Sequence, residues 1–115
     1  MSTVRGWLRP GISHARALRA CFPGGSITGA PKRRAMEIIR ELEGRPRGPY
    51  CGAIGWFGFN GESQFNIAIR TIVVADGVAS FGVGSGITAD SDPRAEFEET
   101  CHKAAGMLEI GRAHV

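Results

Sequence analysis

Two glutamates near the end of the sequence have the type and spacing to bind a cation. Glu96 and Glu99 lie three residues apart, so their carboxylates share one face of a helix that Asp92 and Pro93 are expected to begin. Adjacent carboxylates repel each other unless a positive group lies between them, and oxygen ligands suit Mg²⁺. Acidic residues in a first turn also complement the helix dipole, so a purely structural role stays open.

Arg70 is the second candidate, because it stands among apolar residues in the middle of an expected strand. A guanidinium in that setting needs a carboxylate partner or faces a cavity, unless it lies on a solvated face. Segment 82–86 follows with glycines at every second position. Its backbone N–H groups suit an anion, as in a nest, although a simple bend is the alternative.

The third candidate is segment 22–32, Phe-Pro-Gly-Gly-Ser-Ile-Thr-Gly-Ala-Pro-Lys, which precedes an amphipathic helix expected over 33–43. Free N–H groups at the start of such a helix suit a carboxylate or a phosphate. The segment lacks the Gly-Lys-Ser/Thr ending of a P-loop and the glycine pattern of dinucleotide-binding folds. A tight turn before the helix is the alternative reading.

The elements that must position these residues indicate an α+β fold, an antiparallel meander with flanking helices. Ser13 is expected to cap a short helix that Pro23 stops, and Gly44 to end the helix over 33–43. The expected strands are 50–59, 65–74 and 78–83, with turns at Asn60-Gly61 and Asp76-Gly77. Because two-residue turns cannot link parallel strands, the strands are expected to be antiparallel.

Composition limits the class of protein. The chain has 115 residues and a net charge of +3, which fits one modest globular domain. Its basic residues are not interleaved with aromatic ones, and no stretch reaches the length of a membrane span, so we expect neither nucleic acid nor membrane as a partner. Three widely spaced cysteines indicate reduced thiols, and no signal peptide is evident, so we expect a cytoplasmic protein.

Taken together, these motifs resemble the chorismate-utilising enzymes, a family that includes anthranilate synthase component I and aminodeoxychorismate synthase component I. The resemblance spans Ser2 to Leu108. The Pro-Gly-Gly-Ser-x-Thr-Gly form of the first segment is similar to the aminodeoxychorismate, or para-aminobenzoate, branch, whereas anthranilate synthases tend to read Pro-Ala-Gly-Thr-x-Ser-Gly. The stretches that carry the resemblance are 23–32, 34–39, 67–71, 84–91 and 96–100.

The resemblance implies roles for five residues in binding chorismate. Ser26 stands where a hydroxyl lies near the substrate ring. Tyr50 and Arg70 stand where a phenol and a guanidinium hold the enolpyruvyl side, and a bidentate arginine–carboxylate contact suits that role. Gly84 and Gly86 stand where backbone N–H groups meet a substrate carboxylate.

The resemblance also implies a metal and a reaction. Glu96 and Glu99 stand where carboxylates bind Mg²⁺, which holds the ring carboxylate of the substrate. The expected reaction replaces the 4-hydroxyl of chorismate with an amino group, using ammonia from a glutamine amidotransferase subunit or domain, on the route to folate. Anthranilate synthesis is one alternative, and a non-catalytic domain that binds chorismate or a partner is the other.

Finally, the resemblance implies that residues 1–108 are the C-terminal portion of a longer chorismate-binding domain. The family has a second glutamate pair, an active-site histidine and, in the aminodeoxychorismate branch, a nucleophilic lysine, none of which has a counterpart here. We therefore expect little or no turnover from this chain alone, since such groups act as a unit. The string Ile110 to Val115 is what a common sequencing adapter encodes, so residues 109–115 are expected to be a non-native tail.

Overall fold

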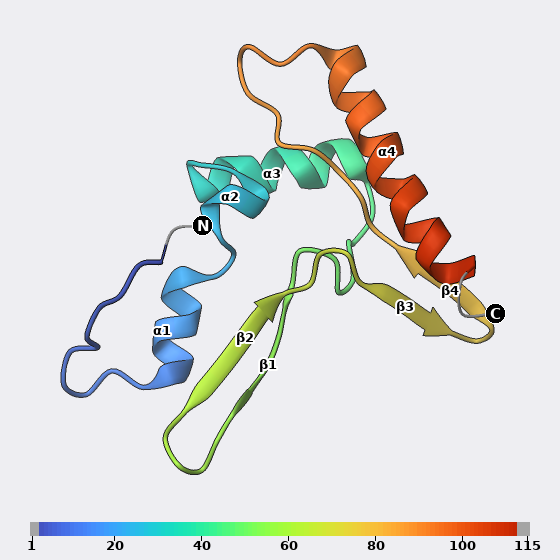
Figure 1. Cartoon of the computed structure of the whole chain (residues 1–115). Helices are drawn as coiled ribbons and strands as arrows, with labels where there is room; N and C mark the ends of the chain where they lie inside the picture. Colours follow the sequence, from blue (N-terminus) through green and yellow to red (C-terminus); the bar gives the residue numbers. More distant parts are fainter. Residues whose placement is uncertain (1–2, 113–115) are drawn as a thin grey trace.

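The structure is a computed structural model that describes residues 3–112, with side chains through Glu109. Three helices are followed by two small antiparallel sheets and then by a last helix, which confirms the α+β class (Figure 1). The elements are α1 (His14–Cys21), α2 (Gly25–Thr28), α3 (Lys32–Glu43), β1 (Ala53–Phe57), β2 (Ser63–Ile67), β3 (Ile72–Ala75), β4 (Val78–Phe81) and α4 (Pro93–Arg112).

The expected caps begin and end the helices. Ser13 Oγ accepts a hydrogen bond from the Arg16 N–H at 3.3 Å at the start of α1. Asp92 Oδ1 does the same for the Ala95 N–H at 2.8 Å at the start of α4. Helix α3 ends at Gly44, whose left-handed φ of 62° is the conformation that glycine adopts without strain.

Two details of the helices were not foreseen from the sequence. Segment 22–32 contains the single helical turn α2, and Pro31 is the N-cap of α3. Helix α4 also continues through Gly111 to Arg112. The expectation of a non-native tail falls partly on residues 113–115, which lie outside the described residues, and it stays a prediction.

The strands form two separate hairpins and not one meander. β1 pairs with β2, with Ala53 opposite Ile67, and β3 pairs with β4. The prediction of one continuous strand over 65–74 is wrong, because Arg70 has a left-handed φ of 52° that turns the chain between β2 and β3. The predicted two-residue turn is confirmed at Asp76-Gly77. Asn60-Gly61 instead lies within a longer loop, 58–62, in which the Gly61 N–H donates to Gly58 O.

The core of the described chain is small. Cys51, Ala68 and Met107 are its buried apolar residues, while the β1–β2 hairpin projects away from α3 and α4 (Figure 1). The radius of gyration is 16.9 Å, against roughly 13 Å for a compact domain of this length. None of the helices in the described range is long and apolar enough to cross a membrane.

Two hydrogen bonds extend the β1–β2 pairing toward that core. The Cys51 N–H donates to Ala68 O, and the Ala68 N–H donates to Gly52 O, both at 2.9 Å. Cys51 and Ala68 are therefore fixed against each other. Tyr50 precedes Cys51, and Arg70 lies two residues beyond Ala68, so the same end of the hairpin positions both side chains.

Candidate functional site

A cavity of about 400 Å³ lies where the end of the β1–β2 hairpin meets the chain after β4 and helix α4. We call it the Tyr50–Arg70 cavity. Three of the residues predicted to bind substrate, Tyr50, Arg70 and Gly84, line it together. Its apolar wall includes Ile69, Val83 and Met107, and its other polar groups are His102 and Lys103.

Tyr50 lies flat against the backbone that follows β4. A Cβ atom added at Gly82 would lie 2.3 Å from Tyr50 Cγ, so only glycine leaves room for the ring at this position. The Tyr50 hydroxyl oxygen would lie 3.1 Å from a Cβ atom at Gly84. Burial raises the pKa of Tyr50, so its hydroxyl stays protonated at neutral pH and can donate a hydrogen bond.

Arg70 reaches the cavity because its left-handed backbone conformation interrupts the strand. Its residue is exposed, and within residues 3–109 its guanidinium forms no salt bridge. Arg70 thus lies at a cavity, as one alternative from the sequence expected, and it is also exposed to solvent, as the other expected. The guanidinium remains available for a bidentate contact with a carboxylate.

His102 and Lys103 line this cavity although neither was singled out from the sequence, and of the two it is Lys103 that connects neighbouring elements. Its ammonium donates a hydrogen bond to Gly84 O at 3.1 Å and pairs with Glu99 Oε1 at 2.6 Å. A signal was present, since Lys103 follows Glu99 by four residues and therefore shares its helix face. Through Lys103, the predicted metal ligand Glu99 is connected to the cavity that Gly84 lines.

Glu96 lies one turn earlier on α4, beside the segment that leads into the helix. Its Oε1 accepts a hydrogen bond from the Ser91 hydroxyl at 2.6 Å, and the Ser85 hydroxyl donates to its backbone O at 3.4 Å. The hydroxyls of Ser85 and Ser91 hold the pKa of the Glu96 carboxyl below its usual value of 4.5. The carboxylate is therefore ionised at neutral pH.

The donor set at Glu96 and Glu99 fits part of a magnesium site. Glu96 Oε2 is buried and accepts no hydrogen bond from the described residues, so it is free for a hard cation. Glu99 offers its second oxygen beside the bond to Lys103. No group of three or more His, Cys, Asp or Glu side chains suited to a metal occurs within the described range, so this part of the protein would supply no more than the two carboxylates.

Ser26 and Gly86 are not gathered at the cavity. Ser26 is exposed on α2, Gly86 is exposed after β4, and neither lines the Tyr50–Arg70 cavity. Their implied roles stay predictions. Near Ser26, the Thr28 hydroxyl oxygen is buried without a hydrogen-bond partner among the described residues, and the sequence analysis did not single it out.

Comparison with known proteins adds independent evidence. A family described as chorismate binding enzyme matches residues 1–109. The chain is 57% identical over 107 residues to anthranilate synthase component 1 of Streptomyces coelicolor, covering 93% of this chain and 21% of that protein. It is 53% identical over 110 residues to aminodeoxychorismate synthase of Streptomyces griseus, covering 96% of this chain and 15% of that protein.

A third relative has the same character. Aminodeoxychorismate synthase component 1 of Bacillus subtilis is 50% identical over 107 residues, which cover 93% of this chain and 23% of that protein. The chain thus spans less than a quarter of the length of each of these relatives. The chain is similarly identical to anthranilate synthases and to aminodeoxychorismate synthases, so sequence identity does not determine which reaction the whole protein catalyses.

Proposed function

The chain belongs to the family of chorismate binding enzymes, and we propose that the whole protein binds chorismate in the Tyr50–Arg70 cavity. The observation that carries the proposal is the convergence of Tyr50, Arg70 and Gly84 on one hollow, with Lys103 beside them. These residues come from three separate parts of the chain, so their convergence is a property of the fold.

The cavity matches the chemistry of a ring compound with two carboxylates. Arg70 supplies a planar fork that pairs with one carboxylate, and the Tyr50 hydroxyl supplies a neutral donor to the same side of the substrate. Lys103 adds a second positive charge. Ile69, Val83 and Met107 provide apolar surface for the faces of the ring.

Glu96 and Glu99 would hold Mg²⁺ next to this cavity. When bound, the ion would neutralise the negative charge of a substrate carboxylate. The lowered pKa of Glu96 keeps its carboxylate ionised at neutral pH and so able to bind a cation. The Ser91 hydroxyl, which donates to Oε1, orients this carboxylate. Lys103 contacts both Glu99 and Gly84 O, which supports a metal ligand close to the cavity wall.

We infer that the reaction is amination of chorismate to aminodeoxychorismate: a C–N bond forms at the 4-position and the hydroxyl leaves as water. The glycine-rich form of segment 23–29 and the aminodeoxychorismate synthase relatives support this branch. Anthranilate synthesis is the second candidate, favoured by the 57% identity to an anthranilate synthase component. Both candidate reactions would use ammonia supplied by a glutamine amidotransferase. Both also fit a cytoplasmic location, where the three free thiols would stay reduced.

The products formed by the whole protein separate these branches. We would incubate it with chorismate, Mg²⁺ and ammonium and resolve the products by chromatography and mass spectrometry. Aminodeoxychorismate that retains its enolpyruvyl group supports the first branch, whereas release of pyruvate with fluorescent anthranilate supports the second. Unchanged chorismate, with no measurable binding, would contradict both.

A further inference from the structure

Tyr50 is held from two sides, and only one of them belongs to the Tyr50–Arg70 cavity. On that side its ring packs against Gly82 and its hydroxyl lies beside Gly84. The Arg47 guanidinium also contacts the ring, with its carbon 5.5 Å from the ring centroid, within the range of a cation–π interaction. Arg47 does not line the Tyr50–Arg70 cavity.

Arg47 is itself firmly held. Its Nε and Nη2 donate to the two carboxylate oxygens of Glu43 at 2.8 and 2.5 Å, a bidentate pair. Its Nη1 donates to Cys51 Sγ at 3.4 Å. The Arg47 side chain is 24% exposed, whereas that of Arg33, near the start of α3, is 94% exposed. Arg47 is thus fixed by three contacts at once.

This arrangement connects two parts of the proposed enzyme. Glu43 is the last residue of α3, the helix that follows the glycine-rich segment, and Cys51 is a buried residue next to Tyr50. Arg47 spans the turn between them. The pair with Glu43 raises the pKa of Arg47 and lowers that of Glu43, so both groups are charged at neutral pH.

We propose that Arg47, clamped by Glu43, is a positioning residue that holds the Tyr50 hydroxyl at the Tyr50–Arg70 cavity. The proposal rests on the function proposed above for that cavity. Arg47 acts on the substrate only through Tyr50, because it has no place in the cavity wall. Removing Arg47 leaves the ring with Gly82 on one face and without its charged partner, so the hydroxyl loses its fixed place beside Gly84.

A double-mutant cycle in the whole protein tests this role by calorimetric titration with chorismate and Mg²⁺. Tyr50→Phe removes the hydroxyl and is expected to weaken binding about tenfold. Arg47→Met should weaken it by a similar factor, and the double variant should bind like either single variant. Multiplying effects in the double variant, or an unchanged affinity of Arg47→Met, would overturn the proposal.

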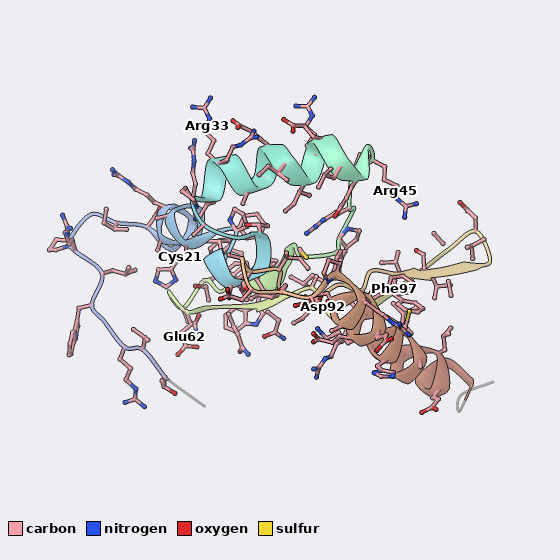
Figure 2. The ribbon with its side chains drawn as sticks, turned by 90° about the horizontal axis from the view of Figure 1, so that it is seen from above. Cys21, Arg33, Arg45, Glu62, Asp92 and Phe97 are labelled. Carbon is pink, nitrogen blue, oxygen red and sulfur yellow. The ribbon has the colours of Figure 1, made fainter. Side chains whose placement is uncertain are left out.

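Three controls separate positioning from folding and from the function itself. Arg33→Met removes an exposed ion pair with Glu37 on the same helix, where the side chain points away from the protein (Figure 2), and should leave affinity unchanged. Arg47→Lys retains the charge but not the bidentate pair, so partial recovery is expected; no recovery with an intact fold would count against the clamp. As the third control, fluorine NMR of fluorotyrosine at position 50 reports the surroundings of the ring without any ligand, so it is independent of chorismate binding.

The fluorine signal makes the two failures distinguishable. If Arg47→Met shifts or broadens this signal while neither it nor Arg70→Met changes chorismate binding, Tyr50 is positioned as inferred and the proposed function fails. If the signal is identical with and without Arg47 in a folded protein, Arg47 does not position Tyr50, whatever the cavity binds.

Discussion

The Lys103 ammonium donates a hydrogen bond to the carbonyl oxygen of Gly84 at 3.1 Å. This contact joins helix α4 to the chain that leaves β4, nineteen residues earlier. The same ammonium pairs with Glu99, so one side chain connects the predicted metal ligand with the wall of the Tyr50–Arg70 cavity. We therefore expect both parts of the proposed site to depend on Lys103.

Replacing Lys103 should therefore weaken chorismate binding. Lys103→Gln removes a charged donor, whose loss costs about 1.5–3 kcal/mol, so the dissociation constant should rise roughly 10- to 150-fold. Isothermal titration of the whole protein measures this directly. Arg94→Gln is the matched control, since Arg94 is exposed on the same helix and pairs only with Glu98 among the described residues. Equal effects of the two substitutions would contradict a specific role for Lys103.

Gly82→Ala should disturb the cavity through Tyr50. The added methyl group would lie 2.3 Å from Tyr50 Cγ, so the ring must move away from the cavity wall. Overpacking of this kind costs about 1–3 kcal/mol of stability. Thermal denaturation and chorismate titration should both show the loss. Gly6→Ala, at a position with no atom within 4 Å, should change neither, and a Gly82→Ala variant with unchanged melting would refute the close packing.

The proposed metal ligands predict a contrast between neighbouring glutamates. Glu99→Ala should lower the Mg²⁺-dependent activity of the whole protein by orders of magnitude, because it removes a carboxylate proposed to hold the ion. Glu98→Ala removes the adjacent carboxylate, which pairs with Arg94, and should retain activity. Activity would be measured as a function of Mg²⁺ concentration, with chelator-treated protein as the metal-free control. An unchanged rate in Glu99→Ala would end the metal assignment.

The Glu96 carboxyl predicts a pH dependence with a defined sign. Its folded-state pKa lies below 4.5, so its stabilising bonds are present above pH 4.5 and are lost as the pH falls through the lower folded-state value. Ser91→Ala removes the hydroxyl that donates to Oε1 and should raise the pKa of Glu96 toward its usual value. Carboxyl-carbon NMR titration would measure both values. A pKa unchanged by Ser91→Ala would show that the hydroxyl does not stabilise the carboxylate.

Local chemistry made much of the fold predictable. Ser13 and Asp92 cap helices as their side chains suggested, Gly44 ends α3, and Asp76-Gly77 turns a hairpin. Each of these features depends on a few neighbouring residues, which a sequence displays directly. The alternation of apolar residues could not reveal the break at Arg70, because a left-handed arginine is set by the packing around it and not by its own preference.

The candidate site shows the same division. Arg70 and segment 82–86 were singled out by residue type and spacing, the family resemblance added Tyr50, and the fold brings Tyr50, Arg70 and Gly84 to one cavity. The contact of Lys103 with Gly84 and the packing of Tyr50 on Gly82 both join residues that are distant in sequence. No local sequence pattern predicts such contacts. Ser26 and Gly86, assigned by the same resemblance, remain apart from the cavity in the described chain.

The most direct test of the account is the affinity of the whole protein for chorismate when Arg70 is replaced. Arg70→Met removes the cavity's unpaired guanidinium, so binding measured by isothermal titration with Mg²⁺ should weaken by roughly 10- to 150-fold. Arg94→Met, which removes an exposed guanidinium on α4, should leave the dissociation constant unchanged. Wild-type affinity in a folded Arg70→Met variant would contradict the proposal that this cavity binds chorismate.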